Sequence, residues 1–408
     1  MPDIASHNGI AVADIASING QDVPSGGAAS EPSSGFLTLG GSLPGNNVIR
    51  FGENNNNTFE SVTFHSSVSS VPATSAITKV SSGRYQAGML DSSNNLYVSS
   101  SGNNETGTAS IYGGHYRQFS IELTSVADFS FGKDHGLAVK TDGTLWGIGG
   151  NGDGEFGRGN TTAQYSSFVQ IGSDTNWSKV SCGEDFSLAL KTTGALYSAG
   201  KNSDGRTGQG TTSGDTTSWT QIGSDTDWTQ ISTGDKHSAA IKGGTLATWG
   251  DAGSGRLGNG STSGDVTSPA VVNSDTDWQS IHCGSEYIKA IKTTDGHHYH
   301  AGSGGSFGGG TRGDGSTSST NTFTRIGSDT GWTEFIELVY GSFANYAAGK
   351  KSGSWYACGY YSKSPYIKTG GTATERSITT FVQLASPSPS FFSLIQFSGS
   401  EPEALYIV

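Results

Sequence analysis

Three histidines stand close together in the segment DGHHYHAG, as His297, His298 and His300. Side chains alternate across a β-strand, so His298 and His300 would share one face and could ligate a single metal ion. Aligned with the segment DGTLWGIG, however, His298 takes a leucine position and His300 a glycine position. The pair is therefore a candidate metal site whose alternative is ordinary packing, and no cofactor is expected elsewhere.

The recurring run Ser-Asp-Thr-Asp-Trp places Asp225 near Asp227 and Asp275 near Asp277. Such pairs invite a calcium interpretation, but calcium loops need more oxygen ligands in a defined order. Asx-turns that start a strand, followed by a tryptophan packed between repeats, explain the run more simply. We therefore expect these aspartates to be structural.

Two further histidines, His135 and His237, each follow a recurring glycine by three residues. Other repeats have Gln86, Phe186 and Tyr287 at this position, which indicates a half-buried structural role. No Ser-His-Asp arrangement, carboxylate pair or phosphate loop can be argued from the spacing. No catalytic residue is assigned, and the chain is not expected to be an enzyme.

Tyrosine-rich stretches interrupt the pattern at residues 103–119 and 359–369. Tyrosine offers a flat apolar face and a hydroxyl group, so such loops are candidates for binding a sugar or a protein. Drift of the repeat without function is the alternative. The candidate ligand-binding residues are Tyr112, His115, Tyr116, Tyr360, Tyr361 and Tyr366.

The elements that must position these residues repeat along the chain. Tryptophans at 177, 228, 278 and 332 are separated by 51, 50 and 54 residues. Each is followed by a β-prone stretch, a glycine and a hairpin pattern, and a period near ~50 residues is typical of a propeller or solenoid. The marker glycines are Gly83, Gly132, Gly183, Gly234, Gly284 and Gly341.

A seventh marker, Gly399, stands near the end of the chain, where only the first half of a repeat remains. The second-half pattern occurs instead at residues 35–41, as GFLTLGG. Pairing of the C-terminal with the N-terminal strands would complete a blade and remove two exposed sheet edges. The sequence therefore predicts an all-β, seven-bladed β-propeller over residues 35–408.

Composition limits the possible partners. Charged residues make up 14% of the 408 residues and the formal net charge is −12, which disfavours nucleic acid as a partner. No apolar run is long enough to span a membrane, so membrane insertion is not expected. Cys182 and Cys283 take equivalent places in different repeats, and we expect both to be small buried side chains.

The run after each second-half strand carries a family resemblance. It appears as NGDGEFGRGN from Asn151, NSDGRTGQGT from Asn202, AGSGRLGNGS from Ala252 and GSGGSFGGGT from Gly302. These runs resemble the N-x-x-G-Q-L-G-x-G hallmark of the regulator of chromosome condensation repeat family, and the IGSDTDW phrasing resembles its phage and bacterial members. The resemblance implies a propeller and says little about function.

Residues 1–34 lie outside the expected ring and contain a short duplication, DIASHNG and DIASING. A repeat this short cannot form a domain, so we expect a docking peptide and linker. The pair resembles N-terminal segments on structural proteins of tailed phages. The candidate docking residues are Ile4, Asn8, Gly9, Ile15, Asn19 and Gly20.

The leading functional hypothesis is a virion protein of a tailed phage. Residues 1–34 would bind other virion proteins, and the propeller would contact a host surface glycan or protein as a fibre head or capsid decoration. The alternative is a bacterial propeller that binds or inhibits one protein partner. Nucleotide exchange is disfavoured, because a chromatin-associated member would be expected to carry a basic tail and this chain has none.

Overall fold

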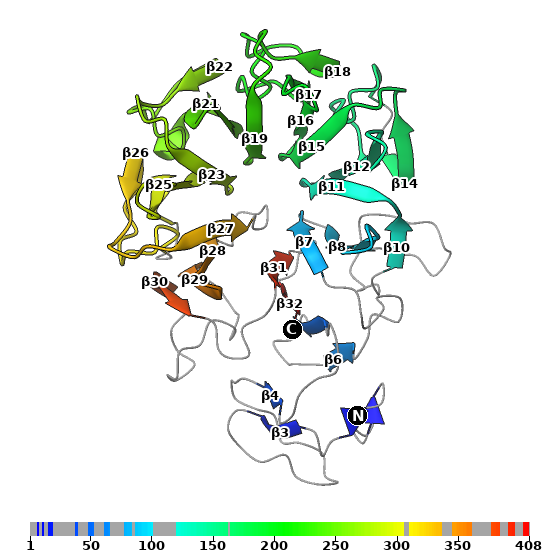
Figure 1. Ribbon diagram of the computed structural model, residues 1–408, viewed down its shortest axis with the longest axis vertical. Helices are drawn as coiled ribbons and strands as arrows, with labels where there is room; N and C mark the ends of the chain where they lie inside the picture. Colours follow the sequence, from blue (N-terminus) through cyan, green and yellow to red (C-terminus); the bar gives the residue numbers. More distant parts are fainter. Residues whose placement is uncertain are drawn as a thin grey trace.

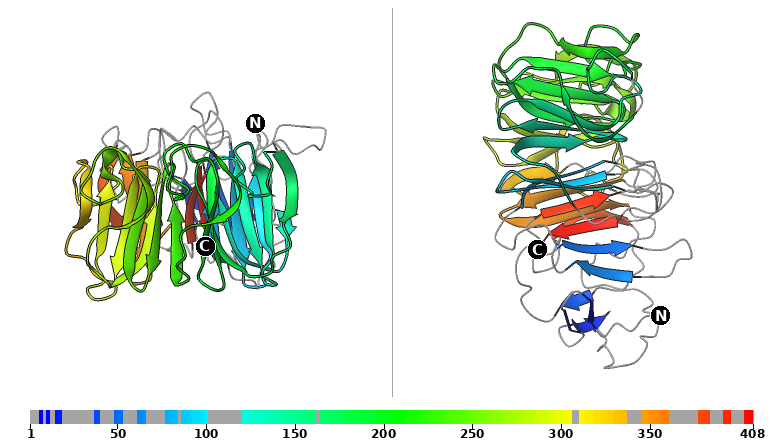
Figure 2. Two further views of the ribbon diagram at one scale, coloured as in Figure 1. Left: turned by 90° about the horizontal axis from the view of Figure 1, so that it is seen from above. Right: turned by 90° about the vertical axis from the view of Figure 1, so that its right-hand side faces the viewer.

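The computed structural model describes residues 77–83, 86–100, 120–161, 164–305, 310–336, 345–360 and 377–383. It also describes the backbone of short strands at 6–7, 10–11, 15–18, 37–39, 48–52, 61–65, 391–395 and 403–407. Four-stranded antiparallel sheets stand around a common centre like the blades of a propeller (Figure 1). Seen from the side, the blades together form a thick disc (Figure 2). The all-β propeller predicted from the repeat is thereby confirmed.

Six blades are each made of four consecutive strands. Blade 1 has β7 (Ile77–Ser82), β8 (Gln86–Asp91), β9 (Leu96–Ser100) and β10 (Ser120–Leu123). Blade 2 has β11 (Val126–Phe131), β12 (His135–Lys140), β13 (Leu145–Gly150) and β14 (Gln164–Ile171). Blade 3 has β15 (Trp177–Cys182), β16 (Phe186–Lys191), β17 (Leu196–Gly200) and β18 (Thr216–Gln221).

Blade 4 has β19 (Trp228–Thr233), β20 (His237–Lys242), β21 (Thr245–Asp251) and β22 (Asp265–Val271), with a 3-10 turn, η2 (Gly253–Gly255), before its last strand. Blade 5 has β23 (Trp278–Cys283), β24 (Tyr287–Lys292), β25 (His298–Gly302) and β26 (Thr320–Arg325). Blade 6 has β27 (Trp332–Ile336), β28 (Asn345–Lys351), β29 (Ser354–Tyr360) and β30 (Ser377–Gln383). The first strand of each blade lies nearest the centre (Figure 1).

The sequence predicted seven blades, but the structure has six blades that are each made of four consecutive strands. The remaining four-stranded sheet is composite, because β31 (Phe391–Ile395) and β32 (Glu403–Ile407) pair with β5 (Val48–Gly52) and β6 (Ser61–His65) from the other end of the chain. Strand β31 lies beside β7 of blade 1 (Figure 1). The N-terminal strands β1 (Ser6–His7), β2 (Ile10–Ala11), β3 (Ile15–Ile18) and β4 (Leu37–Leu39) form two separate two-stranded sheets.

The core is divided into apolar layers between neighbouring blades. Trp177, the first residue of blade 3, packs with Leu137, Leu145 and Phe156 of blade 2. Trp278 of blade 5 packs in the same way with Ala239 and others of blade 4. The tryptophan of the Asp-Thr-x-Trp run therefore packs between blades, as predicted, and the apolar layers join neighbouring blades.

Two repeated hydrogen bonds connect the blades. At the outside, the last glycine of the hallmark run donates its N–H to a carbonyl oxygen in the outer strand of the next blade. Gly159 reaches Thr217 at 2.7 Å, and Gly210 reaches Thr267 at 2.8 Å. Near the centre, a serine hydroxyl accepts the backbone N–H of the next blade, as between Ser130 and Cys182 at 3.0 Å. The hallmark run thus couples neighbouring blades.

Candidate functional site on the loop face

One face of the disc is made of the turns that join the first strand to the second and the third to the fourth in each blade; we call it the loop face. On it, the marker glycines approach one another from blade to blade. A Cβ atom on Gly132 would overlap the carbonyl oxygen of Gly183, and one on Gly234 would approach that of Gly284 too closely. Only glycine fits these places, and the residues that follow each glycine are charged or polar.

Ion pairs run along the loop face from blade 2 to blade 5. Lys133 lies 3.2 Å from Glu184 and 3.4 Å from Asp185 of the next blade. Arg206 is 1% exposed, pairs with Asp204, and donates to the carbonyl oxygen of Asp235 at 3.2 Å. This chain of charges therefore spans the seams between blades.

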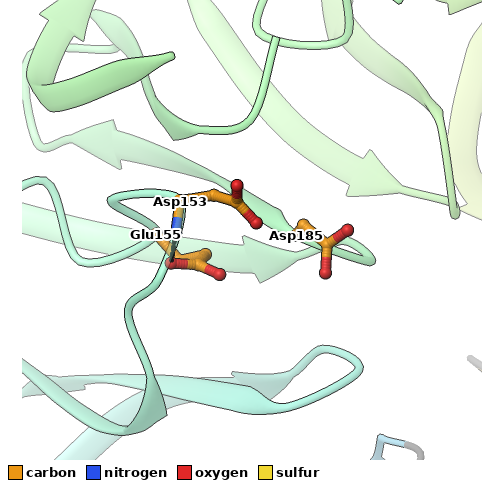
Figure 3. Close-up of side chains that lie close together, drawn as sticks. All are labelled: Asp153, Glu155 and Asp185. Carbon is orange, nitrogen blue, oxygen red and sulfur yellow. Dashed lines mark hydrogen bonds between the residues drawn. The ribbon is translucent and has the colours of Figure 1, made fainter. Parts of the chain in front are cut away.

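A cluster of three carboxylates lies on this face between blades 2 and 3. Single oxygens of Asp153, Glu155 and Asp185 all lie within 4.8 Å of one another (Figure 3). Asp153 and Glu155 come from the hallmark run of blade 2, and Asp185 from the turn after Gly183. The only nearby amine that pairs with both aspartates among the described residues is Lys201, at 4.0 Å from Asp153 and 3.5 Å from Asp185.

The electrostatics of this cluster disfavour full ionisation. Burial raises the pKa of Glu155 to about 7. The hydrogen bond that its Oε2 accepts from the N–H of Asp153, at 3.0 Å, acts in the opposite direction but is weaker. Burial, followed by the charge of Asp185, raises the pKa of Asp153 despite Lys201. Carboxylates held in this way gain from an added positive charge, whether a metal ion or the amine or guanidinium of a partner.

The sequence did not predict this cluster. Asp153 and Asp185 are 32 residues apart and belong to different blades. Their proximity is set by the stacking of blade 3 on blade 2, which no local spacing reveals. The available signal was that the hallmark run carries an acidic residue in blade 2 where blades 3 and 4 have Arg206 and Arg256.

The structure gives His298 and His300 a structural environment. Both are buried on β25, His298 among the rings of Trp332, Phe335 and Phe381, with centroids at 4.8, 5.2 and 5.3 Å. His300 lies 3.0 Å from the carbonyl oxygen of Ser303. The buried Lys289 is the cross-strand partner of His300, so it repels a cation. The metal interpretation is therefore replaced by packing.

Three of the four aspartates of the Ser-Asp-Thr-Asp-Trp runs already have lysine partners. Lys242 pairs with Asp225, and Lys292 lies 2.6 Å from Asp275 and 3.4 Å from Asp277. The same lysines lie over the ring of the next tryptophan, as Lys292 does over Trp278 at 4.7 Å. This supports the structural interpretation, because the lysine occupies the position of a counter-ion.

The histidines after the marker glycines are more buried than predicted. His135 is 1% exposed and lies 2.9 Å from the Ser187 hydroxyl, and His237 is fully buried. Burial lowers the pKa of His135 to about 4, so it is unprotonated at neutral pH. The His135–Ser187 pair resembles a base and a nucleophile, but both side chains are sealed from solvent and no substrate can reach them.

Most of the predicted binding residues lie outside the described residues. These are Tyr112, His115, Tyr116, Tyr361 and Tyr366 of the tyrosine-rich loops, and Ile4, Asn8, Gly9, Asn19 and Gly20 of the N-terminal segment. Tyr360 ends strand β29, and Ile15 begins β3, which pairs with β4. These assignments stay predictions. Cys182 and Cys283 are buried, as predicted.

Comparison with family models identifies the repeat. Residues 126–155 and 177–206 match one model of the regulator of chromosome condensation repeat, and residues 142–190 match another. Residues 126–206 carry regulator of chromosome condensation repeats. Comparison with curated proteins gives no match.

Solved structures share the fold. Human WBSCR16 is 16% identical, with a TM-score of 0.66 over 88% of this chain and 98% of that one. Prp20p from Saccharomyces cerevisiae is 13% identical, with a TM-score of 0.66 over 90% and 92%. The same yeast protein bound to Kap60 is 14% identical, with a TM-score of 0.67 over 93% and 96%. Likeness at this identity concerns the propeller alone. The part of the chain that the structure describes has no helix long and apolar enough to cross a bilayer.

Proposed function

We propose that this chain is a binding scaffold that recognises a protein partner through its loop face. The observation that carries the proposal is the cluster of Asp153, Glu155 and Asp185, whose oxygens lie within 4.8 Å of one another. Burial and then the charge of Asp185 raise the pKa of Asp153, and lysine or arginine from a partner would stabilise its charged form and add to the partial neutralisation by Lys201. The partner is therefore expected to present basic side chains.

Protein binding is also the activity named for a structural neighbour. The solved structure of Prp20p is described together with its binding to Gsp1p and histones. That fact supports protein binding as a use of this fold, while the partner of the present chain is argued from its own carboxylates. Catalysis is not proposed, because the buried His135–Ser187 pair has no access to a substrate.

The test compares binding of synthetic lysine- and arginine-rich peptides with that of glutamate-rich peptides. Asp153→Asn combined with Glu155→Gln leaves Asp185, which pairs with two lysines, in place. We expect the double variant to lose affinity for the basic peptides by about tenfold or more, and added salt to weaken wild-type binding.

Asp225→Asn on the opposite face is the control, since it removes one carboxylate charge, paired with Lys242, at a more exposed position away from the cluster. Its binding is expected to equal that of the wild type. Equal binding by the double variant, or no preference for basic peptides, would contradict the proposal.

A virion role is a second candidate, favoured by the duplication DIASHNG and DIASING in residues 1–34. In that role residues 1–34 attach the propeller to other virion proteins, and the propeller contacts a host surface glycan or protein. Peptide mass spectrometry on purified particles would detect the chain in stoichiometric amounts. Truncation of residues 1–34 should release it from particles; a truncated chain that stays on particles speaks against this role.

We also propose that the composite sheet serves as a seventh blade and closes the ring. Its support is the pairing of β32 with β5 between Tyr406 and Ile49, together with the position of β31 beside β7. Closure would cover the flat side of blade 1 that an open arc would expose.

A further inference from the structure

The seam between blade 5 and blade 6, here the 5/6 seam, departs from the other seams near the centre. In four earlier seams a serine of the first strand accepts the next blade's backbone N–H at 2.9–3.1 Å. These serines are Ser81, Ser130, Ser181 and Ser232. At the equivalent place in blade 5 stands His282, which is 8% exposed and whose Nε2 has no hydrogen-bond partner among the described residues.

His282 begins a row of basic side chains across blade 5. Lys289 is its cross-strand partner on β24, and His300 is the partner of Lys289 on β25. Directly opposed residues project to the same side of a sheet, so the three lie together. In blade 4 the same row is Ser232, Ala239 and Thr248.

The row faces blade 6 and is sealed from solvent. Lys289 is 0% exposed, and its Nζ lies 5.3 Å from the ring of Phe335 and 5.1 Å from that of Phe381, both in blade 6. His298, two residues before His300, packs against the same two rings. The 5/6 seam therefore holds one lysine and three histidines where blade 4 presents Ala239, Ser232, Thr248 and Leu246.

No acid balances these groups among the described residues. Lys289 donates to the carbonyl oxygen of Arg312 at 3.2 Å, and no carboxylate lies within ion-pair distance of it in the described part of the chain. The other titratable groups facing the row are Tyr287 and Cys283 of blade 5 and the Cys358 thiol of β29. Asp314 acts on Lys289 from the following loop, but it is already paired with Arg312 at 2.7 Å.

We propose that the 5/6 seam is an acid-sensitive joint: protonation of His282, His298 and His300 beside Lys289 separates blade 5 from blade 6 locally while the other seams stay closed. Each further positive charge beside Lys289 raises the free energy of the closed seam, because no acidic partner balances it among the described residues and burial removes it from water. Opening to water lowers this cost. At this place His282 replaces the serine that accepts a hydrogen bond in the four earlier seams.

The direction with pH follows from linkage. Burial lowers the pKa of His282 to about 3, and those of His298 and His300 well below the usual value of 6.5. The closed seam therefore favours neutral histidine, and its stability is complete above pH 6.5 and declines as the pH falls from there toward 3. Burial lowers the pKa of Lys289 to about 8, so its effect on the seam is already present at neutral pH.

Hydrogen–deuterium exchange of the full chain tests the joint at about pH 7.5 and about pH 5, after correction for the intrinsic rate. A histidine that stays neutral in the closed seam but takes up a proton with its ordinary pKa in the open seam favours opening as the pH falls. One such histidine raises the equilibrium constant for local opening about thirtyfold between these pH values. We expect at least this increase in peptides of β24, β25 and β27, where three histidines titrate, and a smaller one in peptides of β15–β17, which contact the single histidine His135.

The matched variant transplants the blade 4 residues: His282→Ser, Lys289→Ala, His298→Leu and His300→Thr. It is expected to abolish the acid-induced exchange, and His282→Ser alone should reduce it if the fourfold variant fails to fold. His237→Phe, which gives blade 4 the residue of blade 3 at Phe186, should leave it unchanged. Uniform acid exchange around the ring would overturn the proposal. So would acid exchange that is undiminished in the fourfold variant or, if that variant does not fold, in His282→Ser.

Discussion

Individual residues divide into those whose role is local and those whose role depends on a neighbouring blade. The leucine position of His298 in the repeat predicted packing, and the structure places it among three aromatic rings. The carboxylate cluster could not be predicted, because Glu155 and Asp185 meet only when blade 3 stacks on blade 2. Alignment of repeats predicts side-chain environments within a blade better than contacts between blades.

Glu155→Gln tests how strongly burial acts on one carboxyl group. The pKa of Glu155 is raised from 4.5 to about 7, so the folded protein favours the neutral form, and this side chain weakens the fold as the pH rises from 4.5 through 7. Glutamine keeps the shape without the charge, and its carbonyl oxygen can accept the Asp153 N–H. We expect the variant to be more stable than the wild type by about 1–2 kcal/mol at about pH 8 and equal to it at about pH 4, by chemical denaturation.

Glu122→Gln serves as the reference, since Glu122 is exposed. The same stability difference at both pH values for Glu155→Gln would mean that the effect is not one of ionisation.

At the scale of elements, the repeat predicted both strands and turns. The marker glycine directly follows the first strand in blades 1 to 5, and the hallmark run joins the third strand to the fourth in blades 2 to 5. The N–H of Gly159 donates a hydrogen bond to the carbonyl oxygen of Thr217 in the next blade, at 2.7 Å. The run therefore joins neighbouring blades, a role that the motif alone did not reveal. The pairing of N- and C-terminal strands was predicted from the incomplete halves of a repeat, but the N-terminal half was assigned wrongly to residues 35–41. In the structure Leu37–Leu39 (β4) pairs with β3, and β5 and β6 complete the composite sheet, because pairing across the whole chain is set by contacts that local pattern does not reveal.

Gly132→Ala should be strongly destabilising. The added methyl group would overlap the carbonyl oxygen of Gly183 and crowd the ring of His135, at 2.7 Å from Cε1. Backbone on one side and a buried ring on the other leave little room to relax, so we expect a loss of about 2–3 kcal/mol in the free energy of unfolding. Gly152→Ala is the control, because nothing lies within 4 Å of a Cβ there. Similar melting temperatures for the two variants would refute the steric argument.

At the scale of the molecule, stability depends on whether the two ends of the chain hold the ring. Removal of residues 391–408 deletes β31 and β32, which exposes the edge of β5 and one side of blade 1. We expect this truncation to lower the melting temperature by at least about 5 °C. Removal of residues 1–34 deletes β1 to β3, which pair only with one another and with β4 in the described structure, and should change it little. Calorimetry on both truncated chains measures the difference, and equal losses would argue against closure.

The central serine hydrogen bonds also have a direction along the chain. In each, the acceptor belongs to the earlier blade and the donor to the later one, from Ser81 and Phe131 through to Ser232 and Cys283. During synthesis on the ribosome, blades 2 to 5 therefore each emerge beside a finished blade that already presents the serine acceptor. Only the composite sheet must wait for the last residues, because β5 is made long before its partner β32. The nascent protein should thus grow as an open arc, blade by blade, and its slow folding step should be the final meeting of the two ends.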